Sequence, residues 1–232
     1  ADDPSTCGIP IFTREQFEEM VGYANSHGMQ VAIHAIGDGI LDDILAAYEK
    51  ALKECPRPDH RHGIVHCQIT RPDQLRKFEE LSLHAYIQSI FLDYDMHVVT
   101  SRCGEALSST SYAFKTAKEL GIHVSYGTDS AVEELNPFPN LYSAVTRKDK
   151  DGYPEKGFYP EECVDVSDAI DAYTAGSAYN EFCESFKGRI KPGYLADMVV
   201  LDRDIFTCDP MEIRDILPEM TIVGGTVVYK KQ

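Results

Sequence analysis

Residues 30 to 67 read QVAIHAIGDGILDDILAAYEKALKECPRPDHRHGIVHC, and this stretch decides the fold class. Its first part, Gln30 to Ile36, is a short apolar run rich in β-branched residues, which is typical of a strand covered on both faces. Gly37-Asp38-Gly39 predicts a tight turn, and Ile40 to Glu54 has a helical pattern. A second apolar run, Gly63 to Cys67, follows. The succession of strand, helix and strand predicts a parallel βαβ unit.

The same alternation continues on both sides of this stretch. Upstream, an amphipathic helix is expected from Thr13 to His27, with Thr13 as its N-cap. Downstream, the pattern predicts further helices and apolar runs in turn: helix 73–81, run 82–90, helix 105–120, run 122–126, a loop-rich segment 136–158 and helix 167–178. A doubly wound sheet and a (β/α) barrel both fit this alternation, and periodicity does not choose between them.

The last part of the chain has a different character. Short β-rich runs occur at 197–201, 220–223 and 226–229, and Gly224-Gly225 is a two-residue hairpin signal. We therefore expect an α/β body over residues 1–186 and a small β module over residues 187–232.

Composition and charge exclude several classes of protein. The net charge is −16, and the basic clusters are short, so neither a nucleic acid nor an anionic membrane is expected as a partner. No stretch approaches the roughly 18 apolar residues of a membrane span. The seven cysteines form no CxxC pair, which indicates reduced thiols and neither a disulfide framework nor a thiolate zinc site. The acidic start, Ala1-Asp2-Asp3-Pro4, has no signal-peptide core, so a cytoplasmic location is expected.

Three side chains lie where the predicted strands end, which makes them candidates for a functional site. His34 and His66 lie near the ends of successive apolar runs, and Asp129 follows the run 122–126. In a barrel of parallel strands these ends open on one face, where barrel enzymes place their active sites. Two imidazoles and a carboxylate there would suit Zn²⁺ or a similar divalent ion, which makes hydroxide available from bound water near neutral pH. Asp129 would take up and return the proton.

Each of these residues also has a structural interpretation. A single histidine at a strand end is more often hydrogen-bonded than a ligand, and Asp129 in Gly127-Thr128-Asp129-Ser130 fits a turn or a helix N-cap. Cys67 is expected to pack in the core, on the opposite face from His66. The remaining strand-associated and loop histidines are interpreted as structural or surface residues: His84, His97 and His123.

A set of motifs, in order along the chain, resembles the amidohydrolase family 3 branch, which includes YtcJ-like proteins and N-substituted formamide deformylases. The motifs are His34-Ala35-Ile36-Gly37-Asp38, Arg61-His62-Gly63-Ile64-Val65-His66-Cys67-Gln68, Gly127-Thr128-Asp129-Ser130 and the segment from Lys191 to Asp202. The resemblance implies a (β/α)₈ TIM-type barrel with a small β-sandwich. It makes His34 and His66 metal ligands at the ends of strands 5 and 6, and Asp129 a metal-associated general base at the end of strand 8.

The chain departs from the family pattern in one large respect. Members of the family carry a His-x-His pair on strand 1, whereas the pair His60 and His62 here lies just before the run that would be strand 6. The resemblance therefore maps this sequence onto the second half of the barrel, strands 5–8, with part of the C-terminal sandwich. A half-barrel exposes strand edges, so we expect self-association or association with the missing N-terminal half.

The leading hypothesis is a metal-dependent hydrolase of carbon–nitrogen bonds in small non-peptide amides, acting through a metal-activated water and most simply with zinc. Gln68, Gln88 and Arg102 are the candidate substrate contacts. One alternative is a non-catalytic fragment of such an enzyme with an incomplete metal site. Another is a doubly wound ligand-binding protein without catalysis.

Overall fold

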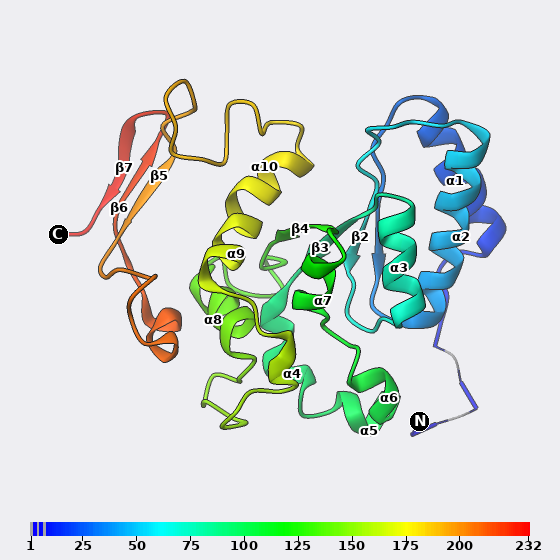
Figure 1. Ribbon diagram of the computed structural model, residues 1–232, viewed down its shortest axis with the longest axis horizontal. Helices are drawn as coiled ribbons and strands as arrows, with labels where there is room; N and C mark the ends of the chain where they lie inside the picture. Colours follow the sequence, from blue (N-terminus) through cyan, green and yellow to red (C-terminus); the bar gives the residue numbers. More distant parts are fainter. Residues whose placement is uncertain (1, 4, 7) are drawn as a thin grey trace. The chain divides into compact units, whose positions relative to one another are not determined.

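The computed structural model describes residues 2–3, 5–6 and 8–232, so Ala1, Pro4 and Cys7, including part of the acidic start, lie outside the described residues. The chain divides into two compact units (Figure 1). Unit 1 comprises Ala1–Ile87 and Tyr94–Val124, and unit 2 comprises Gln88–Asp93 and Ser125–Gln232.

The predicted parallel sheet is confirmed. Its strands are β1 (Ala32–Ala35), β2 (Gly63–His66), β3 (His84–Ile87) and β4 (His123–Tyr126), in the order β1-β2-β3-β4. β1 pairs with β2, and β2 with β3, in parallel. Among these four strands the spatial order follows the chain order. A doubly wound sheet reverses its strand order at a switch point, so this succession favours the barrel arrangement over the doubly wound one.

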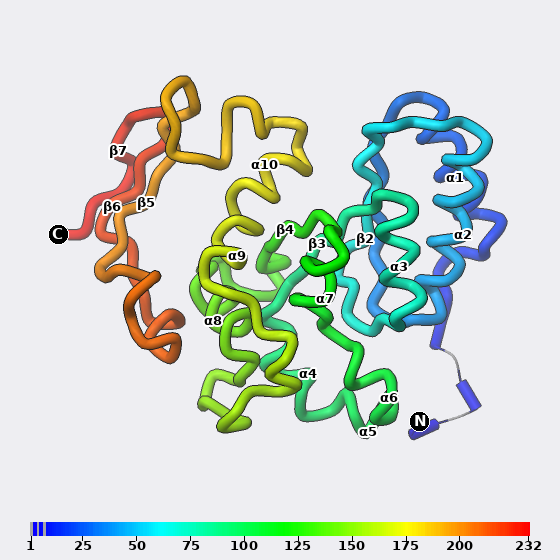
Figure 2. Tube along the Cα trace, in the orientation of Figure 1, coloured from blue at the N-terminus to red at the C-terminus, as the bar shows by residue number. Residues whose placement is uncertain are grey.

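Helix α1 (Arg14–Ser26) begins at the predicted N-cap, Thr13. The Thr13 hydroxyl accepts from the Gln16 N–H at 3.3 Å, and the Gln16 side chain accepts from the Thr13 N–H at 2.8 Å, so a complete capping box starts the helix. The helix buries Phe17 and Val21 and packs against α2 (Asp38–Glu54), as the Cα trace in Figure 2 shows. The adjacent helix α3 spans Pro72–Glu80.

The single helix expected over residues 105–120 is wrong, because two short helices, α6 (Glu105–Ser108) and α7 (Phe114–Glu119), occupy that span. The intervening Ser-Thr-Ser side chains bond backbone carbonyls, which offers the chain an alternative to helical hydrogen bonds. Tyr112 adopts a φ of +51°, which ends helical continuity. Two further short helices precede this region, α4 (Leu92–Asp95) and α5 (Val99–Cys103).

Unit 2 contains a helix that the sequence pattern did not predict, α8 (Phe138–Thr146), inside the segment expected to be loop-rich. Pro137 and Pro139 suggested a loop, but they lie at the start of α8, where proline is tolerated because the first N–H groups have no partner within the helix. The helix packs against η1 (Ser89–Phe91), α9 (Val166–Asp171) and η4 (Pro210–Asp215).

The predicted helix over 167–178 is present as a continuous helical run. It consists of α9, one turn of π-helix, η3 (Ala172–Gly176), and α10 (Ser177–Asn180). A short turn, η2 (Pro160–Glu162), precedes it.

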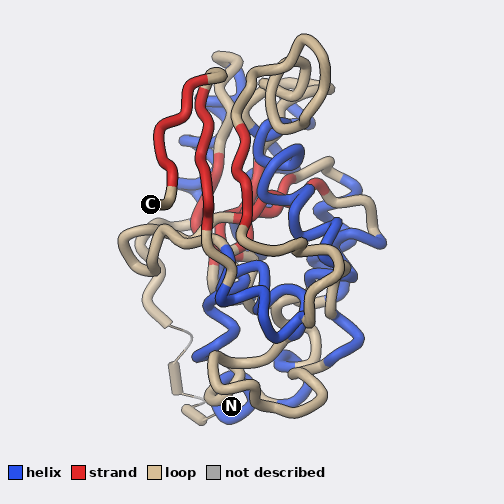
Figure 3. The backbone as a smooth tube through the Cα atoms, turned by 90° about the vertical axis from the view of Figure 1, so that its left-hand side faces the viewer, coloured by secondary structure: helices blue, strands red, loops and turns tan. Residues whose placement is uncertain are grey.

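The C-terminal β-rich runs form an antiparallel sheet in the order β5-β6-β7 (Figure 3), with β5 (Met198–Leu201), β6 (Pro218–Val223) and β7 (Thr226–Lys230). The hairpin prediction is confirmed, because Val223 pairs with Thr226 across Gly224 and Gly225. Both glycines have positive φ, +57° and +80°, which a type I′ turn requires. No helix in the described part of the chain has the length and apolar character needed to traverse a bilayer.

Candidate metal and catalytic site

Two histidines meet at the carboxyl ends of neighbouring strands in unit 1. His34 lies on β1 and His66 ends β2, and the parallel register places Ala35 opposite His66. The two ring centroids are 4.4 Å apart and the ring planes cross at 74°, an edge-to-face contact. His34 is exposed, whereas His66 is 5% exposed. Two potential metal ligands therefore lie side by side.

The backbone changes direction directly after the second imidazole. His66 and Cys67 have φ values of +80° and +51°, a region that residues with a Cβ rarely adopt. Cys67 is buried, as expected, and burial raises the pKa of its thiol above the ordinary value. The thiol donates to the Ile64 carbonyl at 3.3 Å. Cys67 is thus a core residue, without the thiolate character of a nucleophile.

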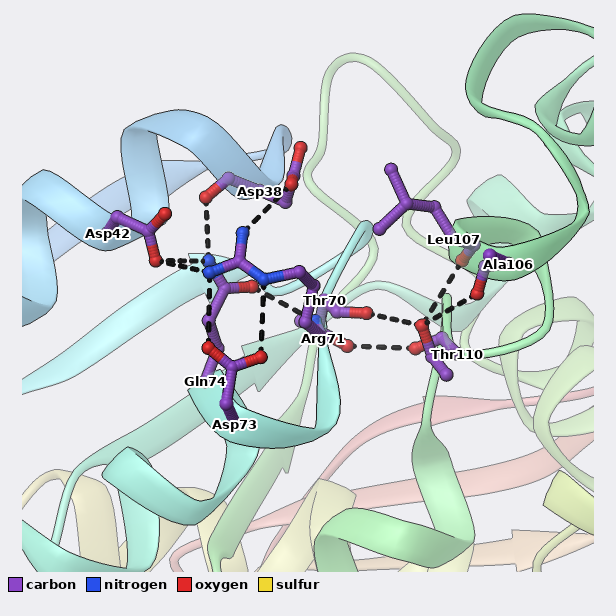
Figure 4. A network of polar contacts seen from close by, with 9 residues as sticks. All are labelled: Asp38, Asp42, Thr70, Arg71, Asp73, Gln74, Ala106, Leu107 and Thr110. Carbon is purple, nitrogen blue, oxygen red and sulfur yellow. Dashed lines mark hydrogen bonds and ion pairs between the residues drawn. The ribbon is translucent and has the colours of Figure 1, made fainter. Parts of the chain in front are cut away.

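The loop that follows His66 is held by backbone and hydroxyl contacts. The Ile69 N–H donates to the Ile36 carbonyl, at the end of β1, at 3.0 Å. Thr70 and Thr110 exchange reciprocal bonds, in which each hydroxyl donates to the other residue's carbonyl, at 2.9 and 2.6 Å (Figure 4). The Tyr112 N–H donates to the Gln68 carbonyl at 2.8 Å. The loops after β1 and β2 are therefore joined to each other and to the turn before α7.

An ionic network then joins the first turns of α2 and α3 (Figure 4). The Arg71 guanidinium donates to Asp38 at 2.9 Å, to Asp42 at 2.7 Å and to Asp73 at 3.2 Å. These bonds, with that to Asp42 contributing most, raise the pKa of Arg71. The Gln74 amide donates to the Asp38 carbonyl at 2.7 Å. The network lies at the helix ends that follow the two histidine-bearing strands.

The Gln68 side chain, a candidate substrate contact, is engaged within unit 1. Its amide nitrogen donates to the Asp95 carboxylate at 2.7 Å and to the Tyr112 hydroxyl at 2.6 Å. Tyr112 in turn donates to the same carboxylate oxygen. Since both amide hydrogens have acceptors, Gln68 can meet a substrate only through its oxygen. No local sequence pattern indicated this triad, because its members are brought together from three separate segments.

Asp129 and Gln88 belong to unit 2. Asp129 follows β4 and is half-buried, with a φ of +58°, and its carbonyl accepts from the Val132 N–H at 2.8 Å. Asparagine and aspartate are the side chains that tolerate this left-handed conformation best. Gln88 is 8% exposed and immediately precedes η1. The third candidate substrate contact, Arg102, is an exposed residue of α5 in unit 1 and pairs with Asp2 at 2.9 Å.

Among the described residues, no group of three or more His, Cys, Asp or Glu side chains lies close enough together to hold a metal ion. The His34–His66 pair supplies neutral nitrogen donors of the kind that Zn²⁺ and related ions prefer. The pair therefore fits two positions of a metal centre, and a complete centre needs further ligands.

A second histidine group in unit 1 is structural. The His60 Nδ1 accepts from the His62 N–H at 2.9 Å, and the His62 Nδ1 accepts from the Val31 N–H at 3.1 Å. The His62 Nε2 faces the Asn25 side-chain oxygen at 3.0 Å. Burial lowers the pKa of His62 to about 3, so this imidazole stays neutral. His84, which is buried, and His123 have ring centroids 5.1 Å apart.

Comparison with known proteins identifies the family of the chain. The model of the amidohydrolase family matches residues 1–229. The chain belongs to the amidohydrolase family. It is 32% identical to the amidohydrolase YtcJ of Bacillus subtilis over 99% of this chain and 43% of that protein. It is 24% identical to the N-substituted formamide deformylase of Arthrobacter pascens over 97% of this chain and 41% of that protein. The family predicted from the motifs is confirmed.

A solved structure is similar to this chain over most of its length. The crystal structure of a metal-dependent hydrolase from Pyrococcus horikoshii superposes with a TM-score of 0.77 at 31% identity, over 90% of this chain and 41% of the other. The chain thus has the mixed α/β fold of amidohydrolase-family metal-dependent hydrolases. It spans about two fifths of the length of these relatives.

Proposed function

We propose that this chain functions as, or as part of, a metal-dependent hydrolase that cleaves carbon–nitrogen bonds in small, non-peptide amides. The contact between His34 and His66 carries the proposal, because it brings two imidazoles together at the carboxyl ends of adjacent parallel strands. That edge is where barrel enzymes place their chemistry. The relatives named as an amidohydrolase and as an N-substituted formamide deformylase support the substrate class.

In this proposal, His34 and His66 hold the metal ion, most simply zinc, whose preferred donors include imidazole nitrogens. When bound, such an ion supplies Lewis acidity that activates water and polarises a carbonyl. Asp129 is the third proposed ligand and would act as the proton carrier, taking up a proton from water and returning it to the leaving amine. Gln88, Arg102 and the side-chain oxygen of Gln68 are the proposed substrate contacts.

The proposal also assigns the strands. β1 to β4 would be strands 5 to 8 of a (β/α)₈ barrel, with residues 1–186 as the barrel part and residues 187–232 as part of a β-sandwich. The parallel sheet in chain order and the antiparallel β5-β6-β7 sheet support this assignment. We propose the cytoplasm as the compartment, in agreement with the free thiols of all six described cysteines.

Zinc binding to the full chain, measured by isothermal titration calorimetry, tests the ligand assignment. His34→Ala and His66→Ala should each weaken zinc binding by more than about tenfold, since losing only an outer partner of a ligand costs roughly 10- to 100-fold. His27→Ala is the matched control, because His27 is an exposed imidazole at the end of α1. Equal affinities in all three variants would remove the basis of the proposal.

Turnover of N-substituted formamides by the zinc-loaded chain tests the reaction. We expect hydrolysis that Asp129→Asn abolishes, because the proton carrier is lost. Zinc binding without any turnover would instead favour the non-catalytic alternative, in which this polypeptide keeps the fold and part of the metal site.

A further inference from the structure

Asn140 is a buried amide on α8 that lies between two loops of unit 2. Its side chain is 1% exposed. One loop follows β3 and begins with Gln88 and Ser89. The other follows β4 and contains Gly127 and Asp129. No sequence pattern identifies Asn140, since it falls in the segment expected to be loop-rich.

Both ends of the Asn140 amide have hydrogen-bond partners. Its oxygen accepts from the Ile90 N–H and lies 2.8 Å from the Ser89 hydroxyl, whose single proton is shared with the Asn140 backbone carbonyl at 2.7 Å. Its nitrogen donates to the Gly127 carbonyl at 2.8 Å and to the Tyr173 hydroxyl. An amide has donors on its nitrogen and acceptor lone pairs on its oxygen, so both the donor side and the acceptor side of Asn140 are satisfied.

This pairing permits only one orientation of the side chain. Rotating the amide by half a turn would set its hydrogens against the Ile90 N–H and its oxygen against the Gly127 carbonyl. A buried polar group that loses its partner is costly, so the orientation is strongly determined. Neither leucine nor aspartate, both close in size, reproduces donors on one side and acceptors on the other.

We propose that Asn140 is a positioning residue that fixes the loops carrying Gln88 and Asp129 relative to each other. Ser89 is the neighbour of Gln88, and Gly127 lies just before Asp129. The Asp129 carbonyl closes a turn with the Val132 N–H, so an anchored Gly127 carbonyl holds the start of that turn. The role of Asn140 in the reaction rests on the proposed function, whereas its effect on the two loops does not.

Amide hydrogen exchange of the full chain, followed at the segment from Thr128 to Val132, tests the anchor. Asn140→Asp keeps the acceptor side and loses both donors, so exchange of the Val132 amide should accelerate at least about tenfold. The serine side chain of Asn140→Ser is too short to reach Gly127, so this variant should also accelerate exchange of the Val132 amide. It is the variant to measure if Asn140→Asp does not fold. Exchange in this segment that stays within about twofold of wild type in a folded variant would overturn the proposal.

Two matched controls separate positioning from a general loss of stability. Tyr173→Phe removes the phenolic partner of Asn140 but leaves the bond to Gly127. Ser143→Ala removes another buried bond between α8 and the same loop, in which the Ser143 hydroxyl donates to the Ser89 carbonyl at 2.6 Å. Both variants should leave exchange at 128–132 within about twofold of wild type. Acceleration equal to that of Asn140→Asp would overturn the proposal.

The separate effects on kcat and KM of formamide hydrolysis link the anchor to the reaction. If Asp129 carries the proton, Asn140→Asp should lower kcat with little change in KM. Turnover that survives Asp129→Asn would refute the proposed function, and the exchange measurement would still decide the role of Asn140. A kcat that matches wild type in Asn140→Asp, where Asp129→Asn is inactive, would overturn the positioning role in catalysis.

Discussion

The buried histidines before β2 show how single hydrogen bonds determine a protonation state. His60 and His62 each accept a backbone N–H at Nδ1, so each must carry its proton on Nε2. The Nε2 of His60 lies 3.0 Å from the Leu81 carbonyl, and that of His62 faces Asn25. Asn25 itself donates to the carbonyls of Ala51 and Cys55, at the end of α2. A second proton on either imidazole would break this chain of bonds.

We therefore predict an acid-sensitive contribution of His62 to stability. Its folded pKa of about 3 lies below the ordinary 6.5, because burial disfavours the charged form. The unfolded state binds the proton more readily, so this contribution is complete above about pH 6.5 and is lost as the pH falls toward 3. At pH 5 the loss should be on the order of 1–2 kcal/mol. Urea unfolding at pH 7.5 and pH 5 measures it.

Variants that each remove one titrating imidazole show which histidine causes the loss of stability between pH 7.5 and pH 5. His62→Gln should flatten the dependence of the free energy of unfolding on pH between 7.5 and 5. His27→Gln, at an exposed position, should keep the wild-type slope. If His62→Gln loses as much stability on acidification as wild type, His62 is not the group responsible.

At the scale of elements, the first turns of α2 and α3 are joined by ion pairs. Arg71 connects three carboxylates there, and its side chain is 30% exposed, so solvent screens these pairs only in part. Lys77 joins the same two helices further along, through a 3.3 Å pair with Glu49. The Arg71 network lies next to the loops that follow His34 and His66.

We predict that Arg71→Met destabilises the chain by about 1 kcal/mol or more, since it removes several charge-assisted bonds at once. Lys77→Met removes a more exposed pair between the same helices and should cost only a few tenths of a kcal/mol. Chemical denaturation gives both values, and hydrogen exchange at residues 67–71 should accelerate in Arg71→Met alone. Similar costs and similar exchange in the two variants would show that the network does not hold this loop.

Local sequence patterns predicted the helices and strands more reliably than they predicted the breaks between them. The strands β1 to β4, the capped helix α1 and the Gly224–Gly225 hairpin could be predicted because each depends on neighbouring residues. The break between α6 and α7 could not, since Thr110 leaves the helical pattern to bond Thr70, far away in the sequence. Likewise, α8 is stabilised by burial of residues such as Phe138 and Leu141 against other elements of unit 2.

At the scale of the whole molecule, β1 lies at one end of the sheet order formed by the described residues. Ala32 and His34 on this strand are exposed. Strand edges of this kind pair readily with another strand. We therefore propose that the isolated chain associates, either with itself or with the part of the fold that its longer relatives also contain.

Light scattering across a concentration series tests self-association of the purified chain. We expect the mean mass to rise with concentration, and to rise further with added salt because the net charge of −16 opposes contact between copies. Ala32→Lys places a charge on the strand at the edge and should reduce the association. A constant monomer mass at every concentration and salt level would contradict the prediction.

By itself, the sequence determined the family, the alternation of strands and helices, and the positions of His34, His66 and Asp129 near strand ends, because these depend on periodicity and on short motifs. Tertiary structure decided which side chains are free to act. The Gln68 amide donates to Asp95 and Tyr112, and the Asn140 amide donates to the Gly127 carbonyl. Such partners come from segments far apart in the chain, and no local pattern encodes which of them will meet once the backbone is folded.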